Sequence, residues 1–183
     1  MTWYAQRGDP MTHGAGSAAV SASETFEEFY EREYPAVVGL AYALSGSRSA
    51  AEDLAQEAFL AAHRDWERVG GFERNDVWVR RVVANMSMSM FRRRYAEARA
   101  LALVALGTAT TMPELSAEGA EFWAAVRALP RRQAQAIALH YLEDRPVAEI
   151  AEILGTAEGT VKKHLHEGRL GVIRRLRLEE DET

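Results

Sequence analysis

A cluster of basic side chains late in the sequence has the spacing of a nucleic-acid-binding helix. Its members recur at intervals that an α-helix would place on one side, and they are Lys162, Lys163, His166 and Arg169. Basic side chains donate hydrogen bonds to phosphate oxygens and, in the major groove, to the acceptor edge of guanine. The chemistry that this pattern indicates is recognition of duplex DNA.

The residues around this cluster supply the elements that would position it. Apolar residues recur at helical spacing on both sides of Gly155, which can take the left-handed conformation that ends a helix. They are Val147, Ile150, Ala151 and Leu154 before the glycine and Val161 and Leu165 after it. The pattern predicts a helix-turn-helix, although similar helix pairs also occur in proteins that never bind nucleic acid.

Charge is segregated along the 183 residues, whose formal net charge is −5. Residues 24–57 hold eight acids against two arginines, whereas residues 74–95 hold six arginines against one acid. Residues 156–178 hold six Lys and Arg against two acids. Two separate basic stretches predict two DNA contacts, and the acidic stretch predicts a protein partner. Such a chain should bind DNA weakly by itself.

Composition excludes several other classes of function. The absence of cysteine excludes disulfides, thiolate zinc sites and a cysteine nucleophile, and the five histidines are scattered, so we expect no metal and no cofactor. No carboxylate pair, nucleophile triad or phosphate-binding glycine loop stands in a suitable context, so we expect no enzymatic activity. Without a long apolar run or a signal segment, we expect a cytoplasmic protein that does not insert into membranes.

Helical periodicity without any strand pattern predicts an all-α protein with two small helical domains joined by a flexible linker. The second domain contains the helix-turn-helix. The predicted segments are a disordered extension (1–23), a three-helix domain (24–95), a linker (96–117), the second domain (118–178) and an acidic tail (179–183).

Local signals predict where helices of the first domain begin and break. The helix that starts near Glu24 is expected to bend or break near Pro35. Ser49 and Glu52 have the spacing of a capping box, which predicts the start of a second helix that runs to about Trp66. A third helix is expected from about Asp76.

Short motifs, taken in order, resemble one known family. They are Phe26–Phe29, Ala51–Phe59, Trp78–Asn85, Leu129–Gln133, Ala148–Ala151 and Glu158–Lys162. In this order and spacing the chain resembles the extracytoplasmic-function (ECF) type of bacterial RNA polymerase sigma factors, the minimal group with two conserved domains. The resemblance covers residues 24–95 and 118–178.

The resemblance implies that the second helix docks on a coiled coil of the largest polymerase subunit, with a further contact on the polymerase flap. The residues expected to bind core polymerase share one helical face, and they are Asp53, Gln56, Glu57 and Leu60. A purely structural helix would also expose acids, so this alternative stays open.

The resemblance further implies that the loop and helix from Phe72 to Arg94 bind the melted −10 element and hold a flipped base. Aromatic surfaces and cations that track the backbone suit single-stranded DNA. The expected −10 contacts are Phe72, Arg80, Arg81, Asn85, Arg92, Arg93 and Arg94. Trp78 is expected either in the core or as a stacking platform.

The resemblance also implies that the helix after Gly155 reads the −35 element as duplex DNA. The expected −35 contacts are Thr160, Lys162, Lys163, His164, His166 and Arg169. Glu167 stands where the family commonly has a basic residue. It would repel phosphate or accept from a cytosine amine, so the residues do not name the promoter sequence.

The predicted function is therefore that of a sigma factor, which binds core RNA polymerase, directs it to promoter DNA and is held inactive by an anti-sigma factor. We expect a monomer when it is free. The alternative is a stand-alone helix-turn-helix repressor or activator, which would dimerise and bind palindromic half-sites without polymerase.

Overall fold

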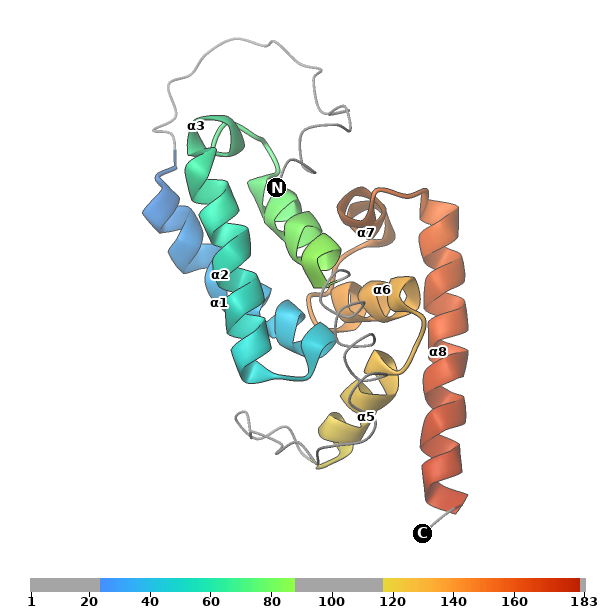
Figure 1. Ribbon diagram of the computed structural model, residues 1–183. Coiled ribbons are helices and arrows are strands. Elements are labelled where there is room, and N and C mark those ends of the chain that lie inside the picture. The colour runs from blue at the N-terminus through green and yellow to red at the C-terminus, as the bar shows by residue number, and fades with distance from the viewer. Residues whose placement is uncertain (1–23, 88–116, 182–183) are drawn as a thin grey trace, which may run out of the picture.

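The computed structural model describes residues 24–87 and 117–181, and every regular element in these two ranges is a helix (Figure 1). The all-α prediction is confirmed. We call residues 24–87 the N-terminal half and residues 117–181 the C-terminal half. The predicted extension and most of the predicted linker lie outside the described residues. The predicted acidic tail begins inside a helix, because α8 continues to Asp181.

The first helix, α1 (Phe26–Ser45), begins with a capping box. The Thr25 hydroxyl accepts from the Glu28 N–H at 3.2 Å, and the Glu28 carboxylate accepts from the Thr25 N–H at 2.9 Å. The helix runs unbroken through Pro35, so the interruption that the sequence allowed there does not occur. Within a helix, proline lacks its own backbone donor and its ring crowds the carbonyl four residues earlier. Both Pro35 and Glu31, whose carbonyl loses that donor, are exposed to water.

The second helix, α2 (Arg48–Arg64), starts before the position that the sequence predicted. Ser47 is its N-cap, and the Ser47 hydroxyl accepts from the Ala50 N–H at 3.4 Å. The predicted cap, Ser49, lies inside the helix, because the chain already turns helical after the left-handed Gly46. After α2 come a short helix, α3 (Trp66–Val69), and a helix described over residues 75–87.

Aromatic rings and small residues form the core of the N-terminal half. The Phe29 ring lies 5.6 Å from the Phe59 ring and 5.1 Å from the Trp66 ring, measured between centroids. These contacts join α1, α2 and α3. Trp78 is only 8% exposed and belongs to this core, which favours the first of its two expected roles.

The C-terminal half contains α5 (Ala117–Arg127), α6 (Arg131–Tyr141), α7 (Val147–Leu154) and the long α8 (Glu158–Asp181). Helix α8 packs along α5, α6 and α7 (Figure 1). Gly155 ends α7 with φ 60° and ψ 48°, and its N–H donates to the carbonyls of α7, so the predicted helix-turn-helix is present.

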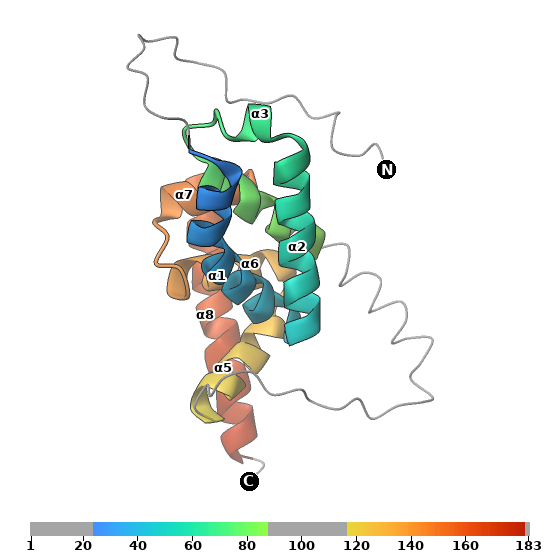
Figure 2. The same cartoon turned by 90° about the vertical axis from the view of Figure 1, so that its left-hand side faces the viewer.

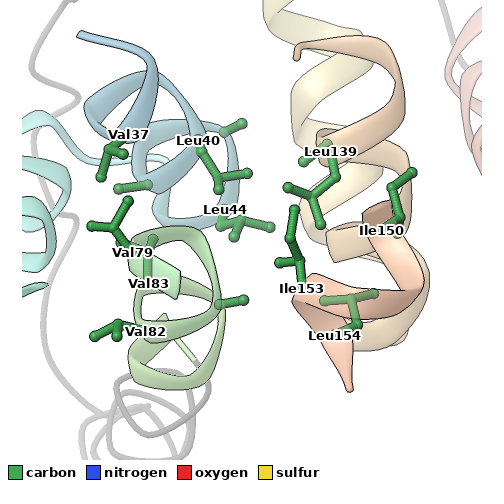
Figure 3. Close-up of a cluster of buried hydrophobic side chains, with 14 of the residues drawn as sticks. Val37, Leu40, Leu44, Val79, Val82, Val83, Leu139, Ile150, Ile153 and Leu154 are labelled. Atoms are coloured by element: carbon green, nitrogen blue, oxygen red, sulfur yellow. The ribbon is translucent and has the colours of Figure 1, made fainter. Parts of the chain in front are cut away.

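The two halves pack directly against each other and share one hydrophobic core. Figure 3 shows Leu40 and Leu44 of α1 pointing toward Leu139 of α6 and Ile153 of α7. Figure 2 shows α6 and α7 beside α1 and the 75–87 helix. We call this contact the interdomain interface. The sequence predicted two domains and gave no sign that their apolar faces meet.

Candidate functional site

The basic face of α8 is open to water. Lys162, Lys163, His166 and Arg169 are all exposed, while the intervening Val161 and Leu165 are 0% and 3% exposed. The buried pair anchors α8 against α7. The alternation of buried and exposed positions therefore fixes which side of α8 faces outward, as the residue spacing predicted.

Acidic neighbours on α8 contact two of these basic groups only loosely. The Lys162 and Lys163 ammonium groups each lie 3.8 Å from a carboxylate one turn away, those of Glu158 and Glu167. Exposed pairs of this kind contribute little stability, so both lysines stay available to a phosphate. Glu167 also accepts from the Gln133 amide at 3.0 Å, which gives it a structural role between α6 and α8.

Two of the predicted −35 residues lie apart from the outward face. Thr160 and His164 are half-buried, and the Nδ1 atom of His164 is buried without a hydrogen-bond partner in the described structure. The His164 ring therefore turns toward the protein. Helical spacing alone had left His164 out of the basic cluster, and only the family resemblance placed it among the −35 contacts.

The predicted polymerase-binding residues form a second exposed face, on α2. Asp53, Gln56, Glu57 and Leu60 are all exposed, and Leu60 is 51% exposed despite its size. The other side of α2 packs into the core against α1 (Figures 1 and 2). An apolar side chain among carboxylates and an amide is a surface suited to a protein partner.

The predicted −10 residues are not exposed together in this arrangement. Phe72 and Asn85 are half-buried, and the guanidinium of Arg68 lies 5.6 Å from the centre of the Phe72 ring. Arg80 is 2% exposed and Arg81 is half-buried. The remaining predicted contacts, Arg92, Arg93 and Arg94, lie outside the described residues.

Arg80 is held between both halves. Its guanidinium donates to the Glu33 carboxylate at 2.6 Å and also pairs with Glu143, which lies in the C-terminal half. Burial alone would raise the pKa of Glu33, but hydrogen bonds from Arg32 and Arg80 outweigh it, and the pKa is lowered. The predicted DNA-binding arginine is thus an internal ion-pair partner here.

Arg81 joins the same contact through the backbone of α7. Its guanidinium donates to the Glu152 carbonyl oxygen at 2.5 Å, near the C-terminus of α7, where a cation is favoured. Further along the 75–87 helix, the Gln135 amide of α6 donates to the Ala84 carbonyl at 2.7 Å. Both bonds tie the 75–87 helix to the C-terminal half.

A second ion pair crosses the interface, and here the N-terminal half contributes the acid and the C-terminal half the base. The Arg145 guanidinium donates to the Asp76 carboxylate at 2.7 Å and to Glu149 at 2.9 Å. Burial alone would raise the pKa of Asp76, but hydrogen bonds from Arg145 and Arg74 lower it. Arg74 also reaches the Glu149 carboxylate at 3.2 Å. Sequence reasoning missed this network, because Asp76 and Arg145 are far apart along the chain and no local pattern joins them.

The described residues also bear on two other classes of site. None of their helices combines the length and the apolar character needed to cross a membrane. They bring no three histidine or carboxylate side chains together in a group that could hold a metal ion.

Two family models match the chain, one in each half. The model described as Sigma-70 region 2 matches residues 29–97, which include α2 and the 75–87 helix. The model described as Sigma-70, region 4 matches residues 119–170, which include the helix-turn-helix. Both models describe parts of one kind of protein, and they occur here in chain order.

Curated relatives carry a more specific name. The ECF RNA polymerase sigma factor SigE of Mycolicibacterium smegmatis is 32% identical over 158 residues, which are 81% of this chain and 60% of SigE. The chain belongs to the ECF group of RNA polymerase sigma factors. The ECF sigma factor SigW of Bacillus subtilis is 28% identical over 152 residues, 75% of this sigma chain and 81% of SigW. The sigma chain thus spans less than two thirds of SigE.

Solved sigma-factor structures have the same fold. The sigma factor RpoE, in its co-crystal structure with the anti-sigma factor NepR from Bartonella quintana, matches 83% of this sigma chain and 96% of its own. The TM-score is 0.67 at 25% identity. CnrH, in complex with the cytosolic domain of CnrY, matches with a TM-score of 0.60 at 20% identity over 84% of this chain and 88% of that chain.

Proposed function

We propose that this ECF sigma factor binds core RNA polymerase and directs it to promoters with a −10 and a −35 element. The observation that carries the proposal is the combination of two exposed faces of different chemistry in one chain. The α8 face is basic and belongs to a helix-turn-helix, and the α2 face is acidic with an exposed leucine. One face suits duplex DNA and the other a protein.

The α8 face is proposed to read the −35 element. Lys162, Lys163, His166 and Arg169 project from the helix that follows the Gly155 turn, which is the helix that enters the major groove in this motif. Arg169 lies 5.9 Å from the centre of the Tyr141 ring, a contact that holds its guanidinium beside the motif. Thr160 and His164 are proposed only as residues next to this face.

The α2 face is proposed to dock on the coiled coil of the largest polymerase subunit. Asp53, Gln56 and Glu57 provide acceptors and an amide, and Leu60 provides an apolar centre among them. Protein interfaces commonly have an apolar centre that is surrounded by a polar rim. A further contact of the C-terminal half with the polymerase flap completes the proposed docking.

The −10 element is proposed to bind Phe72, Asn85 and the arginines of the same region after the two halves separate. Arg80 and Arg81 bind acceptors in the C-terminal half in the present arrangement, so their guanidinium groups become available only when those contacts break. Docking each half at its own site on one polymerase would raise the effective concentration of both DNA-binding surfaces.

An anti-sigma factor is proposed to control this activity. RpoE was solved with an anti-sigma factor, and CnrH with the cytosolic domain of CnrY. The alignment with RpoE covers 83% of this chain, so the likeness extends over both halves. No residue of the present chain identifies that partner or the signal that releases it.

Run-off transcription tests the proposal. Purified bacterial core polymerase is incubated with host genomic fragments, with and without this protein, and new discrete transcripts are expected only when the protein is present. Lys162→Ala and Gln56→Ala should each reduce them strongly, because one removes a proposed −35 contact and the other a proposed polymerase contact. Glu31→Ala, an exposed change on α1 outside both faces, is the matched control and should leave them unchanged.

The same preparation distinguishes the alternative function. Absence of new transcripts, together with tight binding of the protein alone to a palindromic duplex, would replace the sigma-factor proposal with a stand-alone regulator. A dimer in solution would accompany that outcome, whereas the proposal expects a monomer.

A further inference from the structure

Glu167 is an acid on the outward, basic face of α8. It lies one helical turn after Lys163 and next to His166, and both of these residues are exposed. The Glu167 side chain is itself 40% exposed. A carboxylate on a surface that meets DNA is repelled by the phosphates, unless a base offers it a hydrogen-bond donor. The charge of Glu167 therefore lowers general affinity for DNA and suits a specific contact.

Gln133 of α6 holds the Glu167 carboxylate in place. Helix α6 lies across α8 (Figure 1), and a Cβ atom placed on Gly168 would lie 3.5 Å from the Cβ atom of Gln133. The Gln133 amide donates to Oε2 of Glu167 at 3.0 Å. A side chain that is held before binding loses less conformational entropy when it meets its partner. Gln133 thus prepares Glu167 for a directed contact.

The second carboxylate oxygen of Glu167 keeps its acceptor capacity. Oε1 lies 3.8 Å from the Lys163 ammonium, which is beyond hydrogen-bond distance. An ionised carboxyl group accepts hydrogen bonds and donates none, and each of its oxygens has two lone-pair sites. This part of α8 therefore presents an acceptor, Oε1, beside a donor, the Lys163 ammonium.

Cytosine is the base whose major-groove edge fits this acceptor. In the major groove, guanine and thymine present acceptor oxygens, whereas cytosine and adenine each present an amine donor. Adenine carries the N7 acceptor beside its amine, and that acceptor repels a carboxylate. The cytosine amine has a carbon without a lone pair as its neighbour. The chemistry therefore favours cytosine over the other three bases.

The neighbouring lysine matches the other half of the same base pair. In a C·G pair the cytosine N4 donor and the guanine O6 acceptor lie side by side, because they are hydrogen-bonded to each other at about 2.9 Å. The Lys163 ammonium and Oε1 of Glu167 present a donor and an acceptor at a comparable spacing, 3.8 Å. One base pair can thus satisfy both side chains.

We propose that Glu167 selects a cytosine in the −35 element and that Lys163 binds the guanine paired with it. Gln133 is a positioning residue, which orients the carboxylate without touching DNA. This inference rests on the proposed function, because it requires α8 to enter the major groove. It names one base pair of the promoter, which the sequence alone left undecided.

Selection from a pool of randomised duplexes tests the base preference. Purified bacterial core polymerase with this protein retains duplexes that are randomised in the upstream region, and the retained sequences are compared for the wild type and Glu167→Ala. Glu167→Ala should lose a preference for cytosine at one −35 position and keep the preferences at the others. An identical motif from both proteins would overturn the role of Glu167. A wild-type protein that enriches no motif would instead refute the proposed function.

The isosteric Glu167→Gln separates base recognition from folding, and it replaces Glu167→Ala if circular dichroism shows that the alanine variant loses helix content. Glutamine adds an amide donor, so the preference at the same position should move from cytosine toward adenine, whose edge offers an acceptor beside a donor. Glu121→Gln, an exposed change of equal charge on α5, is the matched control and should leave the motif unchanged. Weaker binding of every duplex by Glu167→Gln, without a change of preference at any position, would overturn the proposal.

A chemical change of the base tests the contact itself. N4-methylcytosine at the selected position still pairs with guanine, but its methyl group takes the place of the amine hydrogen that faces the major groove. Polymerase with the wild-type protein should bind this duplex about tenfold more weakly than the unmodified one, and polymerase with Glu167→Ala should bind both within about twofold. Equal losses for the two proteins would mean that the methyl group obstructs another part of α8, and would overturn the contact.

Gln133→Ala tests the positioning role. The ratio of affinities for duplexes with and without the selected cytosine should fall about threefold, because Glu167 remains but must be ordered on binding. Full cytosine discrimination in this variant would remove Gln133 from the proposal and leave Glu167 in it. An equal loss of affinity for both duplexes would show that Gln133 acts only on the packing of α6 against α8.

Discussion

Gly168 of α8 lies where this helix crosses α6, and the crossing leaves no room for a side chain. A Cβ atom placed there would lie 2.9 Å from Cγ1 and 3.3 Å from Cδ1 of Ile137, which is 1% exposed. Gly171 similarly faces Leu129, with only 2.5 Å to Cδ2. These glycines let α8 pack closely on its neighbours. The sequence predicted no role for the two glycines, because only the folded arrangement shows which side chains they face.

We predict that Gly168→Ala destabilises the protein although alanine favours helices. Forcing a methyl group against a buried isoleucine costs about 1–3 kcal/mol, and the higher helix propensity returns at most about 1 kcal/mol. Gly159→Ala is the matched control, since no atom lies within 4 Å of its Cβ position. Urea unfolding should show a loss for Gly168→Ala and none for Gly159→Ala. Equal midpoints would refute the steric explanation.

Lys162 should contribute a measurable share of the salt dependence of duplex binding. Each cation that neutralises a phosphate adds about 0.9 to the slope of log affinity against log salt. Lys162→Ala is therefore expected to lower that slope by about 0.9 when a mixed-sequence duplex is titrated. Arg64→Ala, exposed on α2, serves as the control of equal charge change and should keep the wild-type slope. A similar drop of the slope in both variants would mean that the salt dependence follows the net charge of the protein and not a contact of Lys162 with phosphate.

Helix α2 shows how a local signal can place a helix start two residues too late. The sequence contains a capping pattern at Ser49 and Glu52, but the N-cap is Ser47, which directly follows Gly46, the residue that ends α1 with φ 69°. The connection between α1 and α2 is tight, so the first available hydroxyl becomes the cap. Glu52 instead pairs with Arg48, one turn earlier on the same helix.

The two serines give a direct test of this start. Ser47→Ala should lower the free energy of unfolding by about 1 kcal/mol, because the Ala50 N–H loses its acceptor. Ser49→Ala lies inside the helix and exposed, so it should have no effect or a small stabilising one. Denaturant unfolding of both variants measures the difference. The reverse order of stabilities would restore Ser49 as the cap.

At the scale of elements, most of the fold follows from periodicity and from Gly155. The apolar spacing from Val147 to Leu165 predicted both helices of the motif, and the left-handed turn between them is a local property. The half-buried position of His164 was not predictable, because it depends on how α8 is rotated against the other helices of its half. The same holds for Pro35, which α1 tolerates on its exposed side.

At the scale of the whole molecule, the interdomain interface could not be predicted from the sequence. Arg80 looks like any member of a basic stretch until Glu33 and Glu143 are found on either side of it. Those partners lie 47 and 63 residues away along the chain, and no local pattern joins them. Family resemblance assigns roles to Arg80 and Arg81 on DNA, and the closed fold gives the same residues a second role.

The carboxylates of the interdomain interface should make stability fall in acid. The pKa of Asp76 is lowered by its arginine partners despite burial, and so is that of Glu33. The pKa of Glu149 is also lowered, chiefly by its hydrogen bond from Arg145. A carboxyl group whose folded-state pKa is depressed stabilises the protein fully above its ordinary value, here 3.8 for Asp76 and 4.5 for the glutamates. That stability is lost as the pH falls through the lowered pKa.

We therefore expect the free energy of unfolding to decrease as the pH is lowered from about 5 to about 2, and the decrease to be smaller in Asp76→Asn. The variant lacks the ionisable group, so it starts less stable at neutral pH and loses less in acid. Glu28→Gln also removes a carboxyl group with a lowered pKa, so it should likewise reduce the acid loss of stability, but Glu28 lies outside the interface, which makes this variant the control for the interdomain distance. If the interface is the origin, acid should also separate the two halves before helix content falls. Double electron–electron resonance between spin labels at Arg64→Cys on α2 and Arg174→Cys on α8, both exposed positions, would then show a broader distance distribution. Parallel pH profiles for the wild-type protein and Asp76→Asn would place the acid sensitivity elsewhere in the molecule.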